Sequence, residues 1–316
     1  MVAMAGITTG RFHLLGLDGM PAEELLSLLD EAEGFVAAAE SGRSSDDCAG
    51  RIVANLLFED STRTRFSFTV AARRLGASTI DLTGAGSSVS KDETLLDTAL
   101  NIEAMGVDML VVRSRRAGAP HLIARSVRCA VINAGDGRHE HPTQAMLDIL
   151  TLRRRWGELA GRTVLIVGDI ANSRVARSNV HGLTTLGANV VLVGPPALVP
   201  ATFTQIAAGP GRVTIGHDLD EALPRADAVM MLRIQLERHD EGSAIPPDYR
   251  RLFGLTVDRA ARLRADVPIM HPGPMNRGVE IDSEVADDPD RSVIMEQVTN
   301  GVAVRMVAIR TDWALG

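Results

Sequence analysis

The sequence predicts an α/β protein built from two doubly wound domains, each with a parallel sheet. Short apolar runs typical of buried strands alternate with longer segments that carry apolar residues at helical spacing. This alternation pauses near residue 150 and begins again after Gly161. Polar side chains gather where the predicted strands end, which is where ligands bind in open parallel sheets. At 316 residues, the chain is also long enough for two domains of ordinary size.

The first half of the chain shows four strand-like runs and five helical segments. The first helix is predicted over residues 21–39, with Leu25, Leu28 and Ala32 on one face. The strands are expected at 51–58, 78–82, 108–112 and 130–133. The other helices are expected at 66–75, 93–104, 120–126 and 142–156. The last of these opens on Pro142, a residue suited to the first helical position.

The second half repeats the pattern. Strands are expected at 163–167, 189–193, 226–232 and 267–270, and helices at 175–186 and 296–309. The Pro-rich segment 194–200 is expected to be a loop. Because strands and helices alternate throughout, both sheets are expected to be parallel.

Composition excludes several classes of protein. The net charge is −7, which argues against a general binder of nucleic acid or membrane surfaces. Cys48 and Cys129 are the two cysteines, and they lie far apart without metal-binding neighbours, so neither a disulfide framework nor a zinc site is expected. No signal peptide or membrane span is expected from the apolar patterning either. These features predict a soluble protein of the cytoplasm.

The most informative stretch is Glu-Asp-Ser-Thr-Arg-Thr-Arg at residues 59–65. It occupies a strand-to-helix turn, where the first N–H groups of the helix lack partners and the positive end of the helix dipole points outward. Ser61 and the threonines and arginines that follow it would add donors at the same place, which suits a phosphate. A helix cap provided by Ser61 alone is the simpler alternative.

Other polar side chains follow the remaining strands of the first half. Arg113 directly follows a predicted strand and is either a solvated terminus or an anion ligand. His141 and Gln144 lie at the start of a predicted helix, where each could contact a carbonyl or an N–H group. Ser87 and Lys91 lie in a Gly/Ser-rich loop, which is either a connector or a lid that carries one cation.

In the second half, the segment 168–174 follows a buried strand and invites a dinucleotide-binding interpretation. However, it lacks the GxGxxG spacing that lets the backbone wrap a pyrophosphate. Asn172 or Ser173 could cap the next helix, which would leave Arg174 near the end of the strand.

Two further clusters follow later strands. Arg233 and Gln235 are two residues apart and therefore point to the same side of an extended chain. His-Pro-Gly-Pro at 271–274 is either a plain Pro-rich turn or a rigid set of carbonyls that accept hydrogen bonds from an amide.

Together these clusters offer donors for a phosphate and arginine forks for carboxylates. The sequence shows no metal-ligand cluster, no Ser-His-Asp order and no activated cysteine. The expected chemistry therefore depends on positioning and charge stabilisation between two small anions, as in group transfer from an acyl phosphate.

Four motifs in this order give the chain a resemblance to the aspartate/ornithine carbamoyltransferase family over nearly its whole length. They are Ser-Thr-Arg-Thr-Arg at 61–65, His-Pro-Thr-Gln at 141–144, Leu-Arg-Ile-Gln at 232–235 and His-Pro-Gly-Pro at 271–274. Members that act on ornithine share the first two motifs but carry a Ser-Met-Gly element and a His-Cys-Leu-Pro turn. The third and fourth motifs of this chain resemble those of members that act on aspartate.

The resemblance implies roles for single residues around carbamoyl phosphate. The phosphate would be held by Ser61, Thr62, Arg63, Thr64 and Arg113. Thr64, Arg113 and His141 would polarise the carbamoyl oxygen, and Arg63 and Lys91 would complete the catalytic set. Gln144 and the turn at Pro272, Gly273 and Pro274 would fix the carbamoyl NH2 group.

On the aspartate side, the resemblance implies that Arg174 and Arg233 bind the two carboxylates, with Gln235 and Lys91 assisting. Glu59 would join the two domains by pairing with Arg174 and Arg238 in a closed state. Ser87 and Lys91 would enter the active site of a neighbouring subunit, which implies a homotrimer and favours the lid over the connector.

The resemblance also implies a carbamoyl-phosphate-binding domain at 1–141 plus 295–316 and an aspartate-binding domain at 142–294, joined by interdomain helices. Two departures from the family pattern concern local contacts. The helix after Arg174 reads Val-Ala-Arg-Ser-Asn where family members have a Thr/Val-His-Ser run, and Asp92 follows Lys91 where Gly is commoner.

The expected reaction is transfer of the carbamoyl group of carbamoyl phosphate to the α-amine of L-aspartate, an early step of pyrimidine synthesis. No cofactor or metal is expected, and a regulatory chain or a dihydroorotase partner is left open. The alternatives are transfer to another amino acid and a non-catalytic scaffold in a pyrimidine enzyme complex.

Overall fold

The computed structural model describes residues 12–59, 61–83, 94–234 and 245–314. The chain divides into two compact units. Unit 1 contains residues 1–150 and 299–316, and unit 2 contains residues 151–298. Two helices, α5 (Pro142–Trp156) and α11 (Ile294–Ala314), each include a boundary between the units.

Unit 1 has a four-stranded parallel sheet in the order β2-β1-β3-β4. Its strands are β1 (Ile52–Leu57), β2 (Ser78–Thr83), β3 (Met109–Ser114) and β4 (Ala130–Asp136). Its helices, besides parts of α5 and α11, are α1 (Ala22–Ser41), α2 (Thr62–Arg74), α3 (Leu95–Ala104) and α4 (Ala119–Ala124). All four strands match the positions that the apolar runs predict, to within a few residues.

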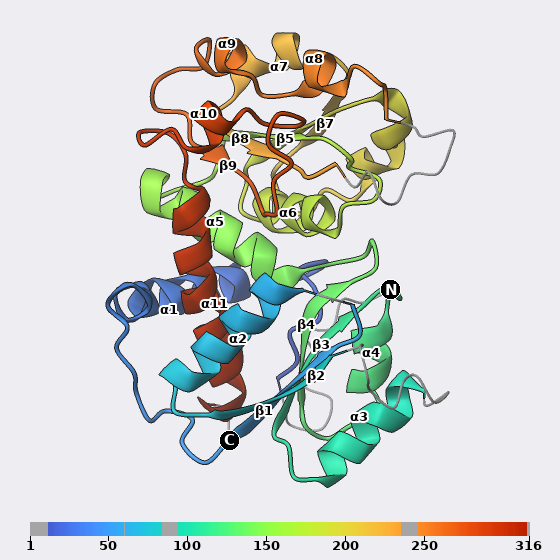
Figure 1. Ribbon diagram of the computed structural model, residues 1–316, viewed down its shortest axis with the longest axis vertical. Coiled ribbons are helices and arrows are strands. Elements are labelled where there is room, and N and C mark those ends of the chain that lie inside the picture. The colour runs from blue at the N-terminus through green and yellow to red at the C-terminus, as the bar shows by residue number, and fades with distance from the viewer. Residues whose placement is uncertain (1–11, 60, 84–93, 235–244, 315–316) are drawn as a thin grey trace. The chain divides into compact units, whose positions relative to one another are not determined.

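Helices cover both faces of this sheet, with α3 and α4 on one side and α1, α2 and α11 on the other (Figure 1). On the first side, Ala99 and Ile123 pack with Leu56 and Leu110 in one apolar cluster. On the other side, the Arg305 guanidinium of α11 lies 5.2 Å from the ring centre of Phe68 in α2. The strands are thus buried on both faces, which explains their continuous apolar runs.

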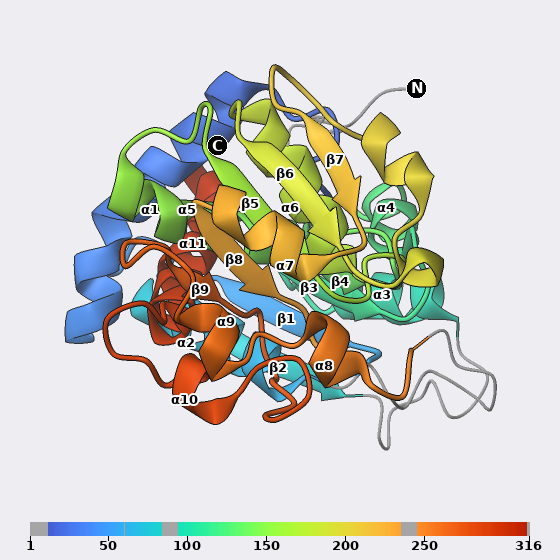
Figure 2. The same cartoon turned by 90° about the horizontal axis from the view of Figure 1, so that it is seen from above.

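Unit 2 has a five-stranded parallel sheet in the order β7-β6-β5-β8-β9, which Figure 2 shows side by side. The strands are β5 (Thr163–Val167), β6 (Asn189–Val193), β7 (Val213–Gly216), β8 (Ala228–Met231) and β9 (Ile269–Met270). The α-helices are α6 (Arg174–Thr185), α7 (Leu219–Ala222), α8 (Tyr249–Phe253), α9 (Val257–Ala260) and α10 (Ser283–Ala286). Short 3-10 turns lie at Pro196–Leu198, Ala201–Gln205 and Leu223–Arg225.

The two parallel-sheet units confirm the predicted fold class. The sequence pattern did not predict β7 or the helices α7 to α10. The segment predicted as a loop at 194–200 contains a short 3-10 turn. Within the described part of the chain, the structure contains no helix with the length and hydropathy of a membrane span.

Candidate active site

The start of α2 has the capping geometry that the sequence suggests. Ser61 is extended, with φ −160° and ψ 100°, and its Oγ accepts a hydrogen bond from the N–H of Thr64 at 3.4 Å. Ser61 is therefore the N-cap of α2. Thr62 and Arg63 are exposed in the first turn of the helix, while Thr64 is buried. A helix start with exposed donors of this kind suits an anion.

Arg113, the next-to-last residue of β3, contacts three other segments of unit 1. One Nη donates to Thr64 Oγ1 at 3.4 Å and to the carbonyl of Ala134 at 3.3 Å, and the other donates to Glu59 Oε1 at 3.4 Å. Its side chain is only 12% exposed. The alternative of a solvated strand terminus is therefore wrong. The residue is held as a largely desolvated cation next to the first turn of α2.

The chain after β4 makes a tight turn before it reaches His141. Gly137 has φ +50°, and a Cβ there would lie 2.9 Å from the Arg115 carbonyl oxygen and from the Ala117 nitrogen, so glycine is required. Farther along this turn, Glu140 accepts hydrogen bonds from the backbone N–H groups of Leu17 at 2.8 Å and Asp18 at 3.2 Å.

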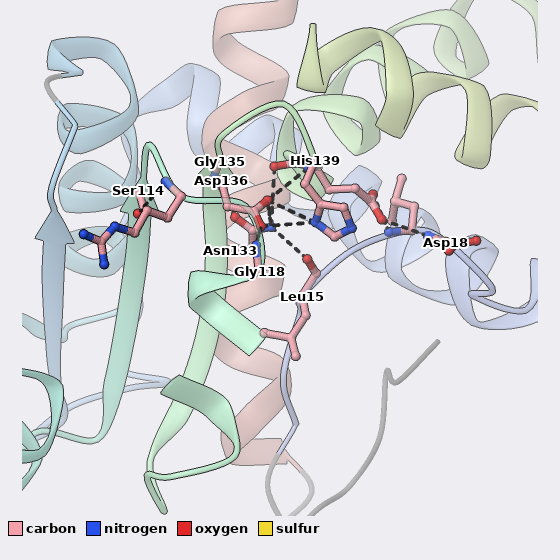
Figure 3. Close-up of polar contacts among 11 residues, drawn as sticks. Leu15, Asp18, Ser114, Gly118, Asn133, Gly135, Asp136 and His139 are labelled. Carbon is pink, nitrogen blue, oxygen red and sulfur yellow. Dashed lines mark hydrogen bonds and ion pairs between the residues drawn. The ribbon is translucent and has the colours of Figure 1, made fainter. Parts of the chain in front are cut away.

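Asp136 organises this turn from a fully buried position (Figure 3). Its carboxylate accepts hydrogen bonds from the Gly118 N–H at 2.6 Å, Asn133 Nδ2 at 2.9 Å and the Glu140 N–H at 3.0 Å, and it lies 3.1 Å from His139 Nδ1. Burial raises the pKa of Asp136. The hydrogen bonds from His139, Asn133 and Gly118 outweigh it, so the net pKa lies below the usual value.

His141 and Gln144 lie at the beginning of α5, as predicted, and both are buried. Gln144 Nε2 donates to Asp148 Oδ1 one turn later, at 3.0 Å. Asp148 also acts electrostatically on Arg305 of α11. Burial lowers the pKa of Arg305 to about 10, and the Asp148 carboxylate limits the fall, so the guanidinium stays charged at neutral pH. The hydrogen bond to Asp148 therefore fixes the orientation of the Gln144 amide.

In unit 2, the chain turns after β5 at Gly168, which has φ +138°. A Cβ there would lie 3.0 Å from the Leu232 side chain, so this position favours glycine. Ser173, rather than Asn172, caps α6, since its Oγ accepts the N–H of Ala176 at 3.0 Å. Asn172 instead donates to the Asp169 carboxylate at 2.9 Å. Arg174 is consequently the first residue of α6, close to the end of a buried strand.

The turn at 271–274 is fixed within unit 2, and its Gly273–Pro274 peptide bond is cis. The N–H of Gly273 donates to His271 Nδ1 at 2.9 Å, so the imidazole hydrogen lies on Nε2, which faces Glu280 Oε1 at 3.3 Å. Asn276 Nδ2 donates to the carbonyl of Ile234 at 2.8 Å. The turn is therefore tied to the segment that directly follows Arg233.

Glu280 is fully buried and supports this arrangement. Besides facing His271, it accepts the N–H of Asn276 at 2.5 Å. Burial, and then the carboxylates of Glu280 and Asp169, raise the pKa of the Tyr249 hydroxyl, which keeps it neutral. The buried Glu280 carboxylate thus supports the His-Pro-Gly-Pro turn through His271 and Asn276.

Some predicted site residues are not among those that the structure describes, and some residues that contribute to the site were not predicted. Ser87, Lys91, Gln235 and Arg238 fall outside the described residues. Asp148, Asn276 and Glu280 were not predicted. A signal for the last two existed, because they follow the His-Pro-Gly-Pro motif within six residues.

Comparison with known families covers both units. The carbamoyl-P binding domain of aspartate/ornithine carbamoyltransferases matches residues 12–154, and their Asp/Orn binding domain matches residues 160–310. The chain therefore belongs to the aspartate/ornithine carbamoyltransferase family.

Within this family, the chain is similar to proteins described as the aspartate carbamoyltransferase catalytic subunit. It is 57% identical to that of Myxococcus xanthus over 295 residues, covering 93% of this chain and 96% of the relative. Identity to that of Rhodospirillum rubrum is 55% over 300 residues, covering 94% and 92%.

Solved structures show the same fold. Aspartate transcarbamoylase from Trypanosoma cruzi, in complex with carbamoyl phosphate and aspartate, has a TM-score of 0.87 at 28% identity, covering 98% of this chain and 99% of that one. Ornithine carbamoyltransferase from Pyrococcus furiosus has a TM-score of 0.84 at 28% identity, covering 98% and 97%. The fold alone therefore does not separate the two activities.

Proposed function

We propose that this protein transfers the carbamoyl group of carbamoyl phosphate to the α-amine of L-aspartate, which yields N-carbamoyl-L-aspartate and phosphate. The observation that carries the proposal is the hydrogen bond from the largely buried Arg113 to Thr64 in the first turn of α2. There, the capped start of α2 and the largely buried Arg113 present donors around one position. The relatives at 53–57% identity, described as aspartate carbamoyltransferase catalytic subunits, support aspartate as the acceptor.

In the proposed reaction, the neutral amine of aspartate attacks the carbonyl carbon of carbamoyl phosphate. A C–N bond forms, and negative charge develops on the carbonyl oxygen. The bond from that carbon to the bridging phosphate oxygen then breaks, the amine proton passes to the departing phosphate, and phosphate leaves. Neither a covalent intermediate with the enzyme nor a cofactor is required, so donors that stabilise the developing charge provide most of the catalysis.

The residues of unit 1 take the roles that the resemblance implies. Ser61, Thr62, Arg63, Thr64 and Arg113 bind the phosphate, and Thr64, Arg113 and His141 stabilise the oxyanion. Two observations support the oxyanion role, since Arg113 already donates to Thr64 Oγ1 and is largely shielded from water. Gln144, fixed by Asp148, orients the carbamoyl NH2 group.

Unit 2 supplies the aspartate ligands in this proposal. Arg174, at the start of α6, and Arg233, after β8, bind the two carboxylates as planar forks, and Gln235 assists. The carbonyls around Gly273 and Pro274 accept from the carbamoyl NH2 group. We assign carbamoyl-phosphate binding to residues 1–141 plus 295–316 and aspartate binding to 142–294.

A steady-state assay of carbamoyl-aspartate formation tests the proposal, with L-ornithine as the control acceptor. We expect turnover with aspartate and little or none with ornithine; turnover with ornithine alone would refute it. N-(phosphonacetyl)-L-aspartic acid, with which the T. cruzi aspartate transcarbamoylase forms a complex, should bind tightly and compete with carbamoyl phosphate. A protein that binds this analogue but lacks turnover would instead support the scaffold alternative.

We further propose a homotrimer in the cytoplasm that acts in pyrimidine synthesis. Ser87 and Lys91 of one subunit would enter the site of the next, and Glu59 would pair with Arg174 and Arg238 on closure. Mixing Lys91→Ala and Arg63→Ala trimers tests the shared site, because subunit exchange should restore part of the activity. Proven exchange without recovery would contradict it.

A further inference from the structure

Three potential metal ligands that are not adjacent in the sequence come together in unit 1. His121 belongs to α4, Asp136 ends β4, and His139 lies in the turn before α5. One ligand atom from each lies within 4.8 Å of the other two. The imidazole rings of His121 and His139 meet edge to face, with ring centres 5.5 Å apart. Neither carbamoyl transfer nor the proposed substrate contacts use His121 or His139.

The contact between His139 and Asp136 suits a shared cation. His139 Nδ1 lies 3.1 Å from Asp136 Oδ2, close to the separation of about 3.3 Å between two ligand atoms on one tetrahedral zinc ion. His121 Nδ1 is buried and has no hydrogen-bond partner among the described residues. The three ligand atoms lie at most 4.8 Å apart, about 1.5 Å beyond the separation expected on one zinc ion.

The carboxylate is held in position before any ion arrives. The N–H groups of Gly118 and Glu140 and the amide of Asn133 all donate to Asp136 (Figure 3). Such outer hydrogen bonds orient a metal ligand and are part of the affinity of known sites.

We infer that His121, Asp136 and His139 form a binding site for one divalent transition-metal ion, with Zn2+ as the best match. Two imidazoles and one carboxylate are the ligands this ion takes in open sites, where water fills the remaining position. Both histidines are partly exposed, so an ion can enter from solvent. The bound ion would tie α4 to the turn that leads to His141, and so stabilise unit 1.

Titration of the chelator-treated, untagged full-length protein with Zn2+ by calorimetry tests this site, and Co2+ absorption reports the ligand geometry. We expect one ion per chain and a rise in Tm on adding Zn2+. His121→Gln should weaken binding by about tenfold or more and abolish the rise in Tm, and His139→Gln should do the same. His121→Gln is the decisive variant because no hydrogen bond to its Nδ1 is lost.

His217→Gln is the matched control, since His217 is a histidine of unit 2 whose Nδ1 lies 3.0 Å from the carbonyl of Gly194. This variant should bind Zn2+ as the parent does. Equal affinity in the parent and in His121→Gln, or fewer than one ion per chain, would overturn the proposal. In that case, the cluster would be only a hydrogen bond between His139 and Asp136 with a second ring packed against it.

Discussion

Arg113 lies where the end of β1, the start of α2 and the end of β4 approach one another, and it donates to a side chain or carbonyl of each. Replacing it with Met keeps the apolar stem but removes the guanidinium. We expect kcat/KM for carbamoyl phosphate to fall by about 10²-fold or more, because a preorganised donor to the oxyanion is lost. Steady-state kinetics at saturating aspartate measures the effect.

Arg116→Met is the control for this variant, because Arg116 is exposed three residues farther along the chain. It should keep the parental kcat/KM. An Arg113→Met protein with the parental circular dichroism spectrum and activity within about threefold of the parent would remove Arg113 from the proposed mechanism.

The pKa of Asp136 predicts how the stability of the fold depends on pH. Its pKa is depressed in the folded protein, since its hydrogen bonds outweigh the effect of burial. A depressed carboxyl pKa stabilises the fold above the unfolded value of about 3.9 and loses this contribution as pH falls through the folded pKa. The free energy of unfolding should therefore decrease from about pH 5 to pH 3, and Asp136→Asn should flatten this dependence.

Urea denaturation across this pH range measures the change. At pH 7, Asp136→Asn should cost about 2 kcal/mol, because at least one buried N–H group loses its acceptor. Asp258→Asn, at an exposed carboxylate, should change stability by no more than about 0.5 kcal/mol. An unchanged pH dependence in Asp136→Asn would show that Asp136 is not the titrating group.

At the scale of single elements, α2 and α6 offer a matched pair of helix caps. Ser61 and Ser173 each accept a hydrogen bond from the N–H three residues later. Replacing either with Ala should lower the free energy of unfolding by about 1 kcal/mol. The functional effects should differ, because Ser61→Ala should raise the KM for carbamoyl phosphate, whereas Ser173→Ala should raise the KM for aspartate by displacing Arg174.

Thr256→Ala provides the purely structural comparison, since Thr256 caps α9 and has no proposed substrate contact. It should reduce stability by a similar amount and leave both KM values unchanged. If Ser61→Ala and Ser173→Ala altered the same KM to the same extent, the assignment of one substrate to each helix would be wrong.

The predictable elements were those with a strong period or a continuous apolar run. β1, β3, β5 and β6 are buried on both faces, so their sequences identify them. In contrast, β7 is an edge strand whose residues are mostly half-buried, and it lacks such a run. The helices α7 to α10 have four or five residues each, too few to show a helical period.

The residues of the candidate site also fall into a predictable group and a group that could not be predicted. Side chains at or just after the end of a strand, such as Arg113 and Arg233, could be predicted because parallel strands end at one edge of a sheet. The roles of Asp148 beside Arg305 and of Glu280 beside Tyr249 could not, since the folded chain brings these groups together from distant parts of the sequence. The cluster of His121, Asp136 and His139 was missed for the same reason, because no metal-binding spacing joins α4 to the turn after β4.

At the scale of the whole molecule, the exposed apolar side chains of α2 and β2 bear on the proposed homotrimer. Phe66 and Val70 are one helical turn apart on α2 and are 55% and 40% exposed. Ile80 is 44% exposed on β2, the edge strand of its sheet and a neighbour of α2. Grouped apolar side chains beside a sheet edge are a common feature of surfaces that bind another protein chain.

Phe66→Glu should therefore convert the proposed trimer to monomers, because a carboxylate would be buried without a partner at the interface. Sedimentation velocity at micromolar concentration measures the mass, and Met105→Glu, at a 74% exposed position on another helix end, should leave it unchanged. Activity should fall together with the trimer, since Ser87 and Lys91 are proposed to act in a neighbouring subunit. Monomers of Phe66→Glu with full activity would show that each chain completes its own site, and a trimer that persists in this variant would place the interface elsewhere.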